Sequence, residues 1–223
     1  MVKRYFSYCS GARQDNEDVV ASFESGTTRL DLICDGMSGY GYGKLAAELV
    51  AGTIMAGMER VHLQGSNANH AICEIVGMAN DQVRVQREAL KAKFGVTLAG
   101  VLAHDGTFLA FWLGDVRIYH IRSGSVLFCS LDHSLMNTGW DKTEEWPGGI
   151  EHIVTASVSG RSIGKLAIEE LSVNPGDRIV ICSDGIWRKI DISTLAEMNS
   201  GSLEKFLKTT VFDDDHSLVC YSV

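Results

Sequence analysis

The chain has 223 residues and a formal charge of −8, because 28 acidic residues outnumber 20 lysines and arginines. This length is enough for one domain with a sizeable core, and the composition, 45% hydrophobic and 22% charged, is ordinary for a globular protein. The acidic surplus would repel a phosphate backbone, which argues against non-specific nucleic-acid binding. The negative net charge does not exclude binding of a small phosphorylated group by a local arginine.

No targeting or membrane-spanning pattern is visible in the sequence. The residues after Met1 carry no apolar run, and the most apolar stretch, 96–113, is interrupted by His104-Asp105-Gly106. The 6 cysteines are scattered and form no Cys-x-x-Cys pair. We therefore expect free thiols and a cytoplasmic protein that does not enter a membrane.

The first half of the chain is predicted to contain strands followed by two helices. Short β-branched and aromatic segments indicate strands at 3–10, 18–24 and 29–34. After Asp35-Gly36 the apolar spacing becomes helical, with one stripe over 46–61 and a second over 72–90. Ser66 or Asn67 is a candidate N-cap for the second helix.

The second half is predicted to be mainly strands. Two hairpins are expected, because His104-Asp105-Gly106 and Ser123-Gly124 separate apolar segments and glycine allows the positive φ of a tight turn. The predicted strands are 96–103, 107–113, 117–122, 125–130, 168–173, 178–182 and 217–223, and short helices are expected at 193–198 and 203–208. The polar, irregular segment 132–164 is predicted to be a surface excursion.

The order of these elements indicates the fold class. Strands pair through tight turns and two consecutive helices are inserted as a block, which differs from the strict strand–helix alternation of a parallel sheet. The sequence therefore predicts an α+β fold, a central antiparallel β-sandwich flanked by helices, in a single domain over 1–223.

Carboxylates recur near the ends of the predicted strands. They stand at 15–18, 35, 115, 184 and 213–215. One interpretation is that Asp-Gly pairs simply end strands, because both residues favour turns. The alternative is that the clusters converge. Two carboxylates about 4 Å apart would repel by roughly 4 kcal/mol at an effective dielectric constant near 20, so a converged cluster needs a cation. Oxygen ligands of this kind favour Mg²⁺ or Mn²⁺ over zinc.

Arg13 suggests a substrate class. It precedes Glu17 by four residues, and a guanidinium matches phosphate oxygens with two parallel hydrogen bonds. The alternative is an ordinary solvated surface arginine.

A set of motifs in a fixed order resembles a known family. The motifs are Arg13-x-x-Asn16-Glu17-Asp18, Asp35-Gly36-Met37-Ser38-Gly39, Gly95-Val96-Thr97, Gly114-Asp115-Val116-Arg117, Asp132-His133-Ser134, Ser183-Asp184-Gly185 and Asp214-Asp215-His216-Ser217. Together they resemble the metal-dependent type 2C serine/threonine protein phosphatases in their compact bacterial form. The resemblance extends from about Arg13 to the C-terminus.

The resemblance implies two Mn²⁺ or Mg²⁺ ions at one end of the sandwich, with Asp35 bridging them and the Gly36 carbonyl as a further ligand. It assigns Asp184 and Asp214 to the first ion, Glu17 and Asp18 to the second, and Asp115 with Asp184 to a third, weaker ion of bacterial members. Arg13 matches the phosphate-binding arginine. Segment 132–164 matches a flap beside the active site, here short.

The implied reaction is attack on protein phosphoserine or phosphothreonine by a water activated between the ions, without a phosphoenzyme. Such an enzyme would act in signalling, opposing a Ser/Thr kinase. Met37 stands where eukaryotic members have a histidine proposed as general acid, and bacterial members commonly have Met there. Two alternatives are left open, a non-catalytic pseudophosphatase that binds a phosphoprotein or regulatory partner, and a two-metal phosphodiesterase.

Overall fold

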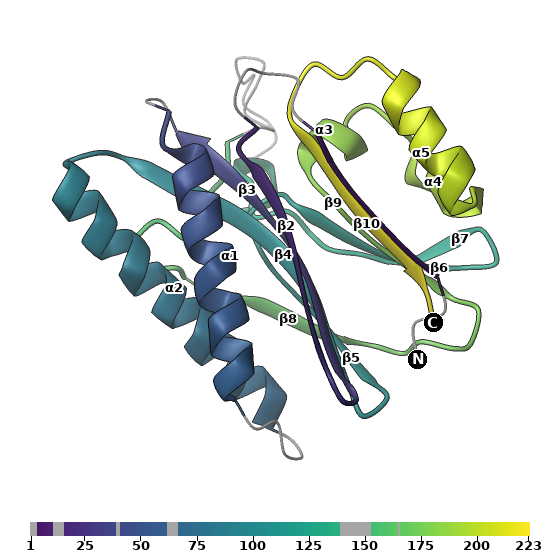
Figure 1. Ribbon diagram of the computed structural model, residues 1–223, viewed down its shortest axis with the longest axis horizontal. Helices are drawn as coiled ribbons and strands as arrows, with labels where there is room; N and C mark the ends of the chain where they lie inside the picture. Colours follow the sequence, from purple (N-terminus) through teal and green to yellow (C-terminus); the bar gives the residue numbers. More distant parts are fainter. Residues whose placement is uncertain (1–3, 11–15, 39–40, 62–66, 139–152, 165) are drawn as a thin grey trace.

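The computed structural model describes residues 4–10, 16–38, 41–61, 67–138, 153–164 and 166–223. Its framework is a pair of five-stranded sheets in which every pairing is antiparallel (Figure 1). The first sheet has the order β1 (Arg4–Ser10), β10 (His216–Ser222), β9 (Arg178–Cys182), β6 (Arg117–Arg122) and β7 (Ser125–Cys129). The second has the order β2 (Asp18–Ser25), β3 (Thr28–Ser38), β4 (Phe94–His104), β5 (Thr107–Leu113) and β8 (Ala167–Leu171).

Helices cover the outer face of each sheet. The long helices α1 (Gly43–Arg60) and α2 (Ala68–Leu90) pack on the second sheet, and the short helices α3 (Asp184–Trp187), α4 (Ile192–Glu197) and α5 (Ser200–Thr209) lie beside the first (Figure 1). The predicted α+β class, an antiparallel sandwich flanked by helices, is confirmed. Within the described residues, no helix combines the length and apolarity needed to cross a bilayer.

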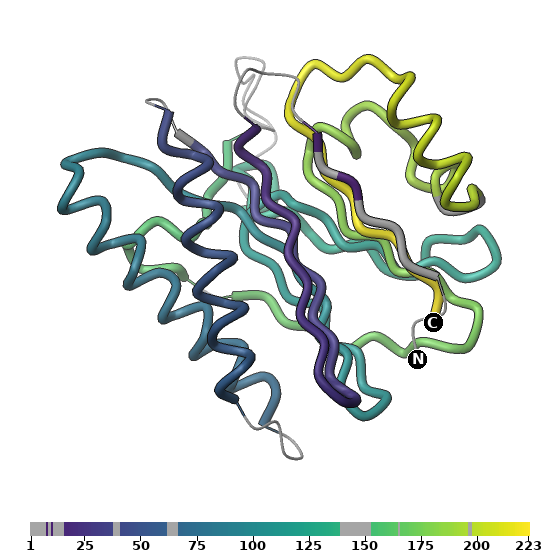
Figure 2. The backbone as a smooth tube through the Cα atoms, viewed as in Figure 1, coloured from purple at the N-terminus to yellow at the C-terminus, as the bar shows by residue number. Residues whose placement is uncertain are grey.

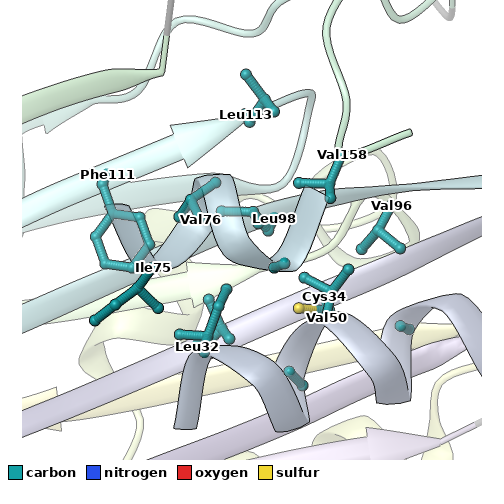
Figure 3. Packing of buried hydrophobic residues seen from close by; sticks show 14 of the residues in the cluster. Leu32, Cys34, Val50, Ile75, Val76, Val96, Leu98, Phe111, Leu113 and Val158 are labelled. Carbon is teal, nitrogen blue, oxygen red and sulfur yellow. The ribbon is translucent and has the colours of Figure 1, made fainter. Parts of the chain in front are cut away.

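Three apolar layers hold the four structural layers together. One lies between the long helices and the second sheet, one between the two sheets, and one between the first sheet and the short helices. Strand β3 contributes to two of them, since Leu32 and Cys34 face the helices while Ile33 faces the other sheet. Figure 3 shows Leu32, Cys34 and Val50 packed together in the layer beneath the helices. The burial of both faces explains the continuous apolar run in this strand.

One predicted boundary is wrong in a way that matters for the site. Asp35 and Gly36 lie inside β3 and do not follow it, because the pairing with β4 continues to Ser38 opposite Phe94. The strand-ending interpretation of this Asp-Gly pair therefore fails. Gly36 has a different purpose, since a Cβ there would collide with the backbone of Gly43 at the start of α1.

Smaller differences have local causes. The single helical turn of α3 was not predicted, because four residues carry no periodic signal. Asn67 does occupy the N-cap position of α2, but its side chain accepts no capping hydrogen bond. The cysteines whose state is described, Cys34, Cys73, Cys129, Cys182 and Cys220, are free thiols as expected.

The predicted excursion over 132–164 is only partly described, since residues 139–152 lie outside the described ranges. Its described parts are tied to each other and to the sandwich. Ser134 forms a β-bridge with Val154, and Val158 exchanges two backbone hydrogen bonds of 2.9 Å with Val96 of β4.

Candidate active site

The candidate site lies where the apolar interior between the two sheets ends. In the second sheet, the last apolar row across β2, β3 and β4 is Val20, Ile33 and Ala99. Residues two positions apart on a strand share a face. The next row on the same face is Asp18, Asp35 and Thr97, which are aligned across the three strands. The sheet thus changes from apolar to acidic within one step.

The first sheet ends with hydroxyl groups facing this acidic row. Ser183 and Ser217 each lie two positions beyond an interior residue of β9 or β10, and both are fully buried. Strand β2 contacts both α1 and β10, and its course between them can be followed in Figure 2. The hydroxyl groups of Ser183 and Ser217 each donate to Asp18 Oδ2 at 2.7 Å. Asp18 is therefore fixed from the opposite sheet.

Burial and mutual repulsion shift the acidity of this row. Desolvation is the main cause that raises the pKa of Asp18 to about 6, although the two serine hydrogen bonds oppose it. The pKa of Asp35 is raised well above its ordinary value, first by desolvation and then by Asp18 and other carboxylates. No hydrogen bond or ion pair from a described residue reaches the Asp35 carboxylate, which sets it apart from Asp18.

A second pair of carboxylates stands across the hollow from this row. Asp184 begins α3, and Asp115 lies in the turn between β5 and β6. The guanidinium of Arg188 contacts both, with Nη2 at 2.9 Å from Asp184 Oδ2 and 3.5 Å from Asp115 Oδ2. The pKa of Asp115 is nevertheless raised to about 6, because desolvation and the charge of Asp184 outweigh the effect of Arg188.

Glu17 links the acidic row to the start of α1 and to β10. Its side-chain Oε1 accepts a hydrogen bond from the Gly43 amide at 3.1 Å, and its backbone amide donates to Asp215 Oδ2 at 2.8 Å. A Cβ at Gly43 would occupy the position of the Glu17 carboxylate. The glycine at the start of α1 therefore allows this carboxylate to lie against the helix.

These residues surround one hollow of about 280 Å³. Every residue that was predicted to be a metal ligand lines this hollow: Glu17, Asp18, Asp35, Gly36, Asp115, Asp184 and Asp214. The predicted phosphate-binding residue, Arg13, lies outside the described residues. Within the described part of the chain, no three acidic, histidine or cysteine side chains already form a group able to hold an ion. The carboxylates line the walls of the hollow and do not meet at one point.

Sequence reasoning missed several residues of the hollow. Asp215 and Arg188 line it, and Ser183 and Ser217 hold Asp18, although no role was assigned to any of the four. A signal was available for Arg188, because it follows Asp184 by four residues and an Asp–Arg pair at this spacing meets on a helix. No local pattern links Ser217 to Asp18, since they are separated by 199 positions.

A sequence comparison identifies the family to which this four-layer sandwich with an acidic hollow belongs. The chain belongs to the protein phosphatase 2C family, whose sequence profile matches residues 9–213. The predicted family and the predicted enzyme class, protein-serine/threonine phosphatase, are thereby confirmed.

Individual relatives agree with this assignment. A candidate protein phosphatase of Mycoplasma pneumoniae is 26% identical over 204 residues, which cover 83% of this chain and 78% of that protein. The serine/threonine protein phosphatase PstP of Mycobacterium tuberculosis is 24% identical over 198 residues, covering 83% of this chain but only 36% of PstP.

Solved structures share the fold. The crystal structure of the M. tuberculosis phosphatase PstP/Ppp superimposes with a TM-score of 0.85 at 20% identity, covering 100% of this chain and 99% of that one. The PstP catalytic domain in complex with 2 manganese ions gives a TM-score of 0.81 at 22% identity, covering 98% of this chain and 97% of that one.

Proposed function

We propose that this chain hydrolyses phosphoserine and phosphothreonine in proteins with the help of two Mn²⁺ or Mg²⁺ ions bound in the acidic hollow. The ligands would be the carboxylates of Asp35, Asp184, Asp214, Glu17 and Asp18 together with the Gly36 carbonyl. Asp115, which the resemblance assigns to a third and weaker ion, is not part of this two-ion set. The phosphate would come from a Ser/Thr kinase, as the family and the name of PstP suggest.

The observation that best supports the proposal is the uncompensated charge of the Asp35 carboxylate. Its carboxylate stands in a hollow lined by other carboxylates, and no described residue offers it a donor or a cation. A carboxylate in such surroundings either takes up a proton or binds a positive ion, because its charge is otherwise uncompensated. A set of oxygen donors favours Mg²⁺ or Mn²⁺, and the described residues that line this hollow include no histidine or cysteine, the ligands that would select zinc.

Hydrogen bonds within the protein hold two of the proposed ligands in place. When bound, such ions supply a nucleophilic hydroxide at neutral pH and offset the negative charge of the phosphate oxygens. The two serine hydroxyls fix the Asp18 carboxylate, and the Gly43 amide fixes that of Glu17. These hydrogen bonds reduce the reorganisation needed when ions enter. We propose that Arg13 binds the phosphate of the substrate by a bidentate contact.

The test is phosphatase activity with and without divalent ions. We expect hydrolysis of p-nitrophenyl phosphate and of a phosphothreonine peptide in Mn²⁺, and none in EDTA. Asp35→Asn should lower kcat/KM by more than about 100-fold, because the loss of a partner that only supports a metal ligand already costs about 10–100-fold. Asp213→Asn is the matched control, since Asp213 is exposed, pairs with Lys189 and does not line the hollow.

Four results would contradict the proposal. The first is turnover that survives EDTA, and the second is an Asp35→Asn variant as active as Asp213→Asn. A wild type inactive with Mn²⁺ on both substrates would instead favour the non-catalytic alternative. Faster hydrolysis of bis-p-nitrophenyl phosphate than of p-nitrophenyl phosphate would favour the phosphodiesterase.

A further inference from the structure

Arg188 is the cation that the described residues contribute to the lining of the acidic hollow. Its Nη2 contacts one carboxylate oxygen of Asp184 and one of Asp115, so a single nitrogen joins two carboxylates that come from different parts of the chain. The side chain is one-third exposed, at 33%, whereas those of Asp184 and Asp115 are 16% and 9% exposed. The guanidinium therefore lies at the surface of the hollow above two more buried acids.

The local structure fixes the guanidinium in this place. Asp184 and Arg188 are four positions apart in one helical turn, and the Arg188 amide donates to the Asp184 carbonyl at 3.0 Å. This spacing puts both side chains on one face of the turn. The Arg188 guanidinium also lies 5.1 Å from the centre of the Trp187 ring.

Trp187 connects the helical turn α3 to Asp115. Its indole Nε1 donates to the Asp115 carbonyl at 2.9 Å. The other arginine at this ring, Arg117, lies 3.5 Å from the ring centre and is held by a bidentate pair with Asp132 at 2.9 and 2.8 Å. The indole is thus anchored, and it holds the Asp115 turn next to the guanidinium.

We infer that Arg188 is a built-in counter-ion for Asp115 and Asp184 that keeps a divalent ion out of the space between them. The inference rests on the proposed function, which places ions on the Asp35 side of the same hollow. It also disagrees with the sequence-based expectation that Asp115 and Asp184 bind a third, weaker ion. That expectation does not fit the residues present, because the guanidinium already joins the two carboxylates.

The Arg188 guanidinium has an advantage over a divalent ion from solution in binding Asp115 and Asp184. A guanidinium attached to the same helical turn has a high effective concentration at the carboxylates, so an incoming ion would have to displace it. Once displaced, the positive guanidinium would still repel the ion, because the helical turn keeps it nearby. Arg188 is thus a positioning residue that sets how many ions the hollow binds.

The experiment counts bound ions and does not depend on turnover. Purified protein is dialysed to equilibrium against a series of free Mn²⁺ concentrations, and bound manganese per chain is measured by elemental analysis. We expect Arg188→Met, which removes the charge but keeps an apolar stem, to bind one more ion than the wild type. Arg188→Lys should bind the same number as the wild type because it keeps a cation.

Asp115 variants give an independent test if Arg188→Met does not fold. Asp115→Asn alone should leave the number of bound ions unchanged, because Asp115 holds no ion in the wild type. Where Arg188→Met does fold, adding Asp115→Asn to it should remove the extra ion. Arg84→Met is the matched control, since Arg84 pairs with Asp81 and Glu88 on α2 at 3.3 and 3.7 Å and does not line the hollow.

Two outcomes would overturn the inference: an Arg188→Met protein that binds no more Mn²⁺ than the wild type, or an Asp115→Asn protein that binds one ion fewer. A wild type that binds no Mn²⁺ at all would contradict the proposed function. The inference about Arg188 would still be decided by the difference between wild type and Arg188→Met.

Discussion

Thr97 carries a buried hydroxyl beside the residue on which the proposed chemistry depends. It is aligned with Asp35 across β3 and β4, and its Oγ1 is the buried side-chain oxygen or nitrogen that lacks a hydrogen-bond partner among the described residues. A buried hydroxyl without a partner costs about 1–3 kcal/mol. Such a cost within an active site is common, because function and stability make different demands on the same position.

We predict that Thr97→Val raises the stability of the metal-free protein by about 1 kcal/mol, because valine has a similar shape and no hydroxyl to desolvate. The measurement is urea unfolding in EDTA. Thr53→Val is the control, since the Thr53 hydroxyl donates to the Leu49 carbonyl at 2.7 Å and its loss should not stabilise. A Thr97→Val protein less stable than wild type would mean that the hydroxyl has a partner, such as a bound water.

At the residue scale, the sequence predicted those site residues that have a local signal. Asp35 and Asp184 each follow an apolar run and precede glycine, and both line the hollow. Ser217 was given no role, because its contact with Asp18 exists only once two sheets pack together. The contact of Arg188 with Asp115 has no local signal either, because the two residues are 73 positions apart.

The approach of β3 to α1 is the feature of secondary structure that shapes the site. Gly36 lies within β3, and the backbone of Gly43 occupies the place where its side chain would be. This contact puts the start of α1 beside the acidic row, which is why the Gly43 amide can reach Glu17. The close approach therefore serves both packing and the orientation of a carboxylate.

We predict that Gly36→Ala destabilises the protein by about 2 kcal/mol or more, because the new methyl group forces backbone to move in a packed region. Gly52→Ala should instead stabilise by up to about 1 kcal/mol, since Gly52 lies within α1 with nothing near its Cβ position. Thermal or urea unfolding of the two variants is the measurement. Equal stability of both variants and wild type would contradict the close approach.

Boundaries of elements were predictable where a turn residue ends an apolar run. The predicted bounds of β5, β6 and β9 agree with the structure, because glycine turns and polar residues flank these strands. The end of β3 was placed too early. Asp-Gly is a good turn signal in general, but here strand pairing and the approach of α1 determine the conformation.

Over the whole molecule, the buried carboxylates make stability depend on pH. The folded state of the metal-free protein binds protons more tightly at Asp18 and Asp115, whose pKa values of about 6 exceed the ordinary value of 3.8. Between these values the folded state holds more protons than the unfolded state, so stability rises as pH falls from about 6 toward 3.8. Asp177 affects stability in the opposite direction, because its hydrogen bonds with Arg122 lower its pKa in the folded state. The stability that Asp177 contributes is lost only when the pH falls below the ordinary pKa of an aspartate.

We therefore predict that the metal-free protein is stabilised on going from pH 7 to pH 5 by about 1 kcal/mol for each such carboxylate. Asp18→Asn should reduce this gain by about that amount, whereas Asp213→Asn should leave it unchanged. Urea unfolding in EDTA at the two pH values measures the gain. An Asp18→Asn protein with the same pH dependence as wild type would show that Asp18 is ionised in the folded state throughout this range.

Saturating Mn²⁺ should oppose this dependence of stability on pH. At pH 7 bound ions would compensate the charge of the carboxylates, so manganese should stabilise the protein more at pH 7 than at pH 5, where protons compete for the same oxygens. Thermal unfolding with and without Mn²⁺ at each pH is the measurement. An equal shift at both pH values would argue that manganese binds elsewhere.

Anomalous scattering from manganese in crystals grown with Mn²⁺ tests most directly whether the hollow binds the proposed ions. We predict two peaks in the hollow, at least one of them within coordination distance of Asp35, and no peak between Asp115 and Asp184. The absence of any manganese peak at Asp35 would contradict the assignment of this hollow as a metal-dependent active site.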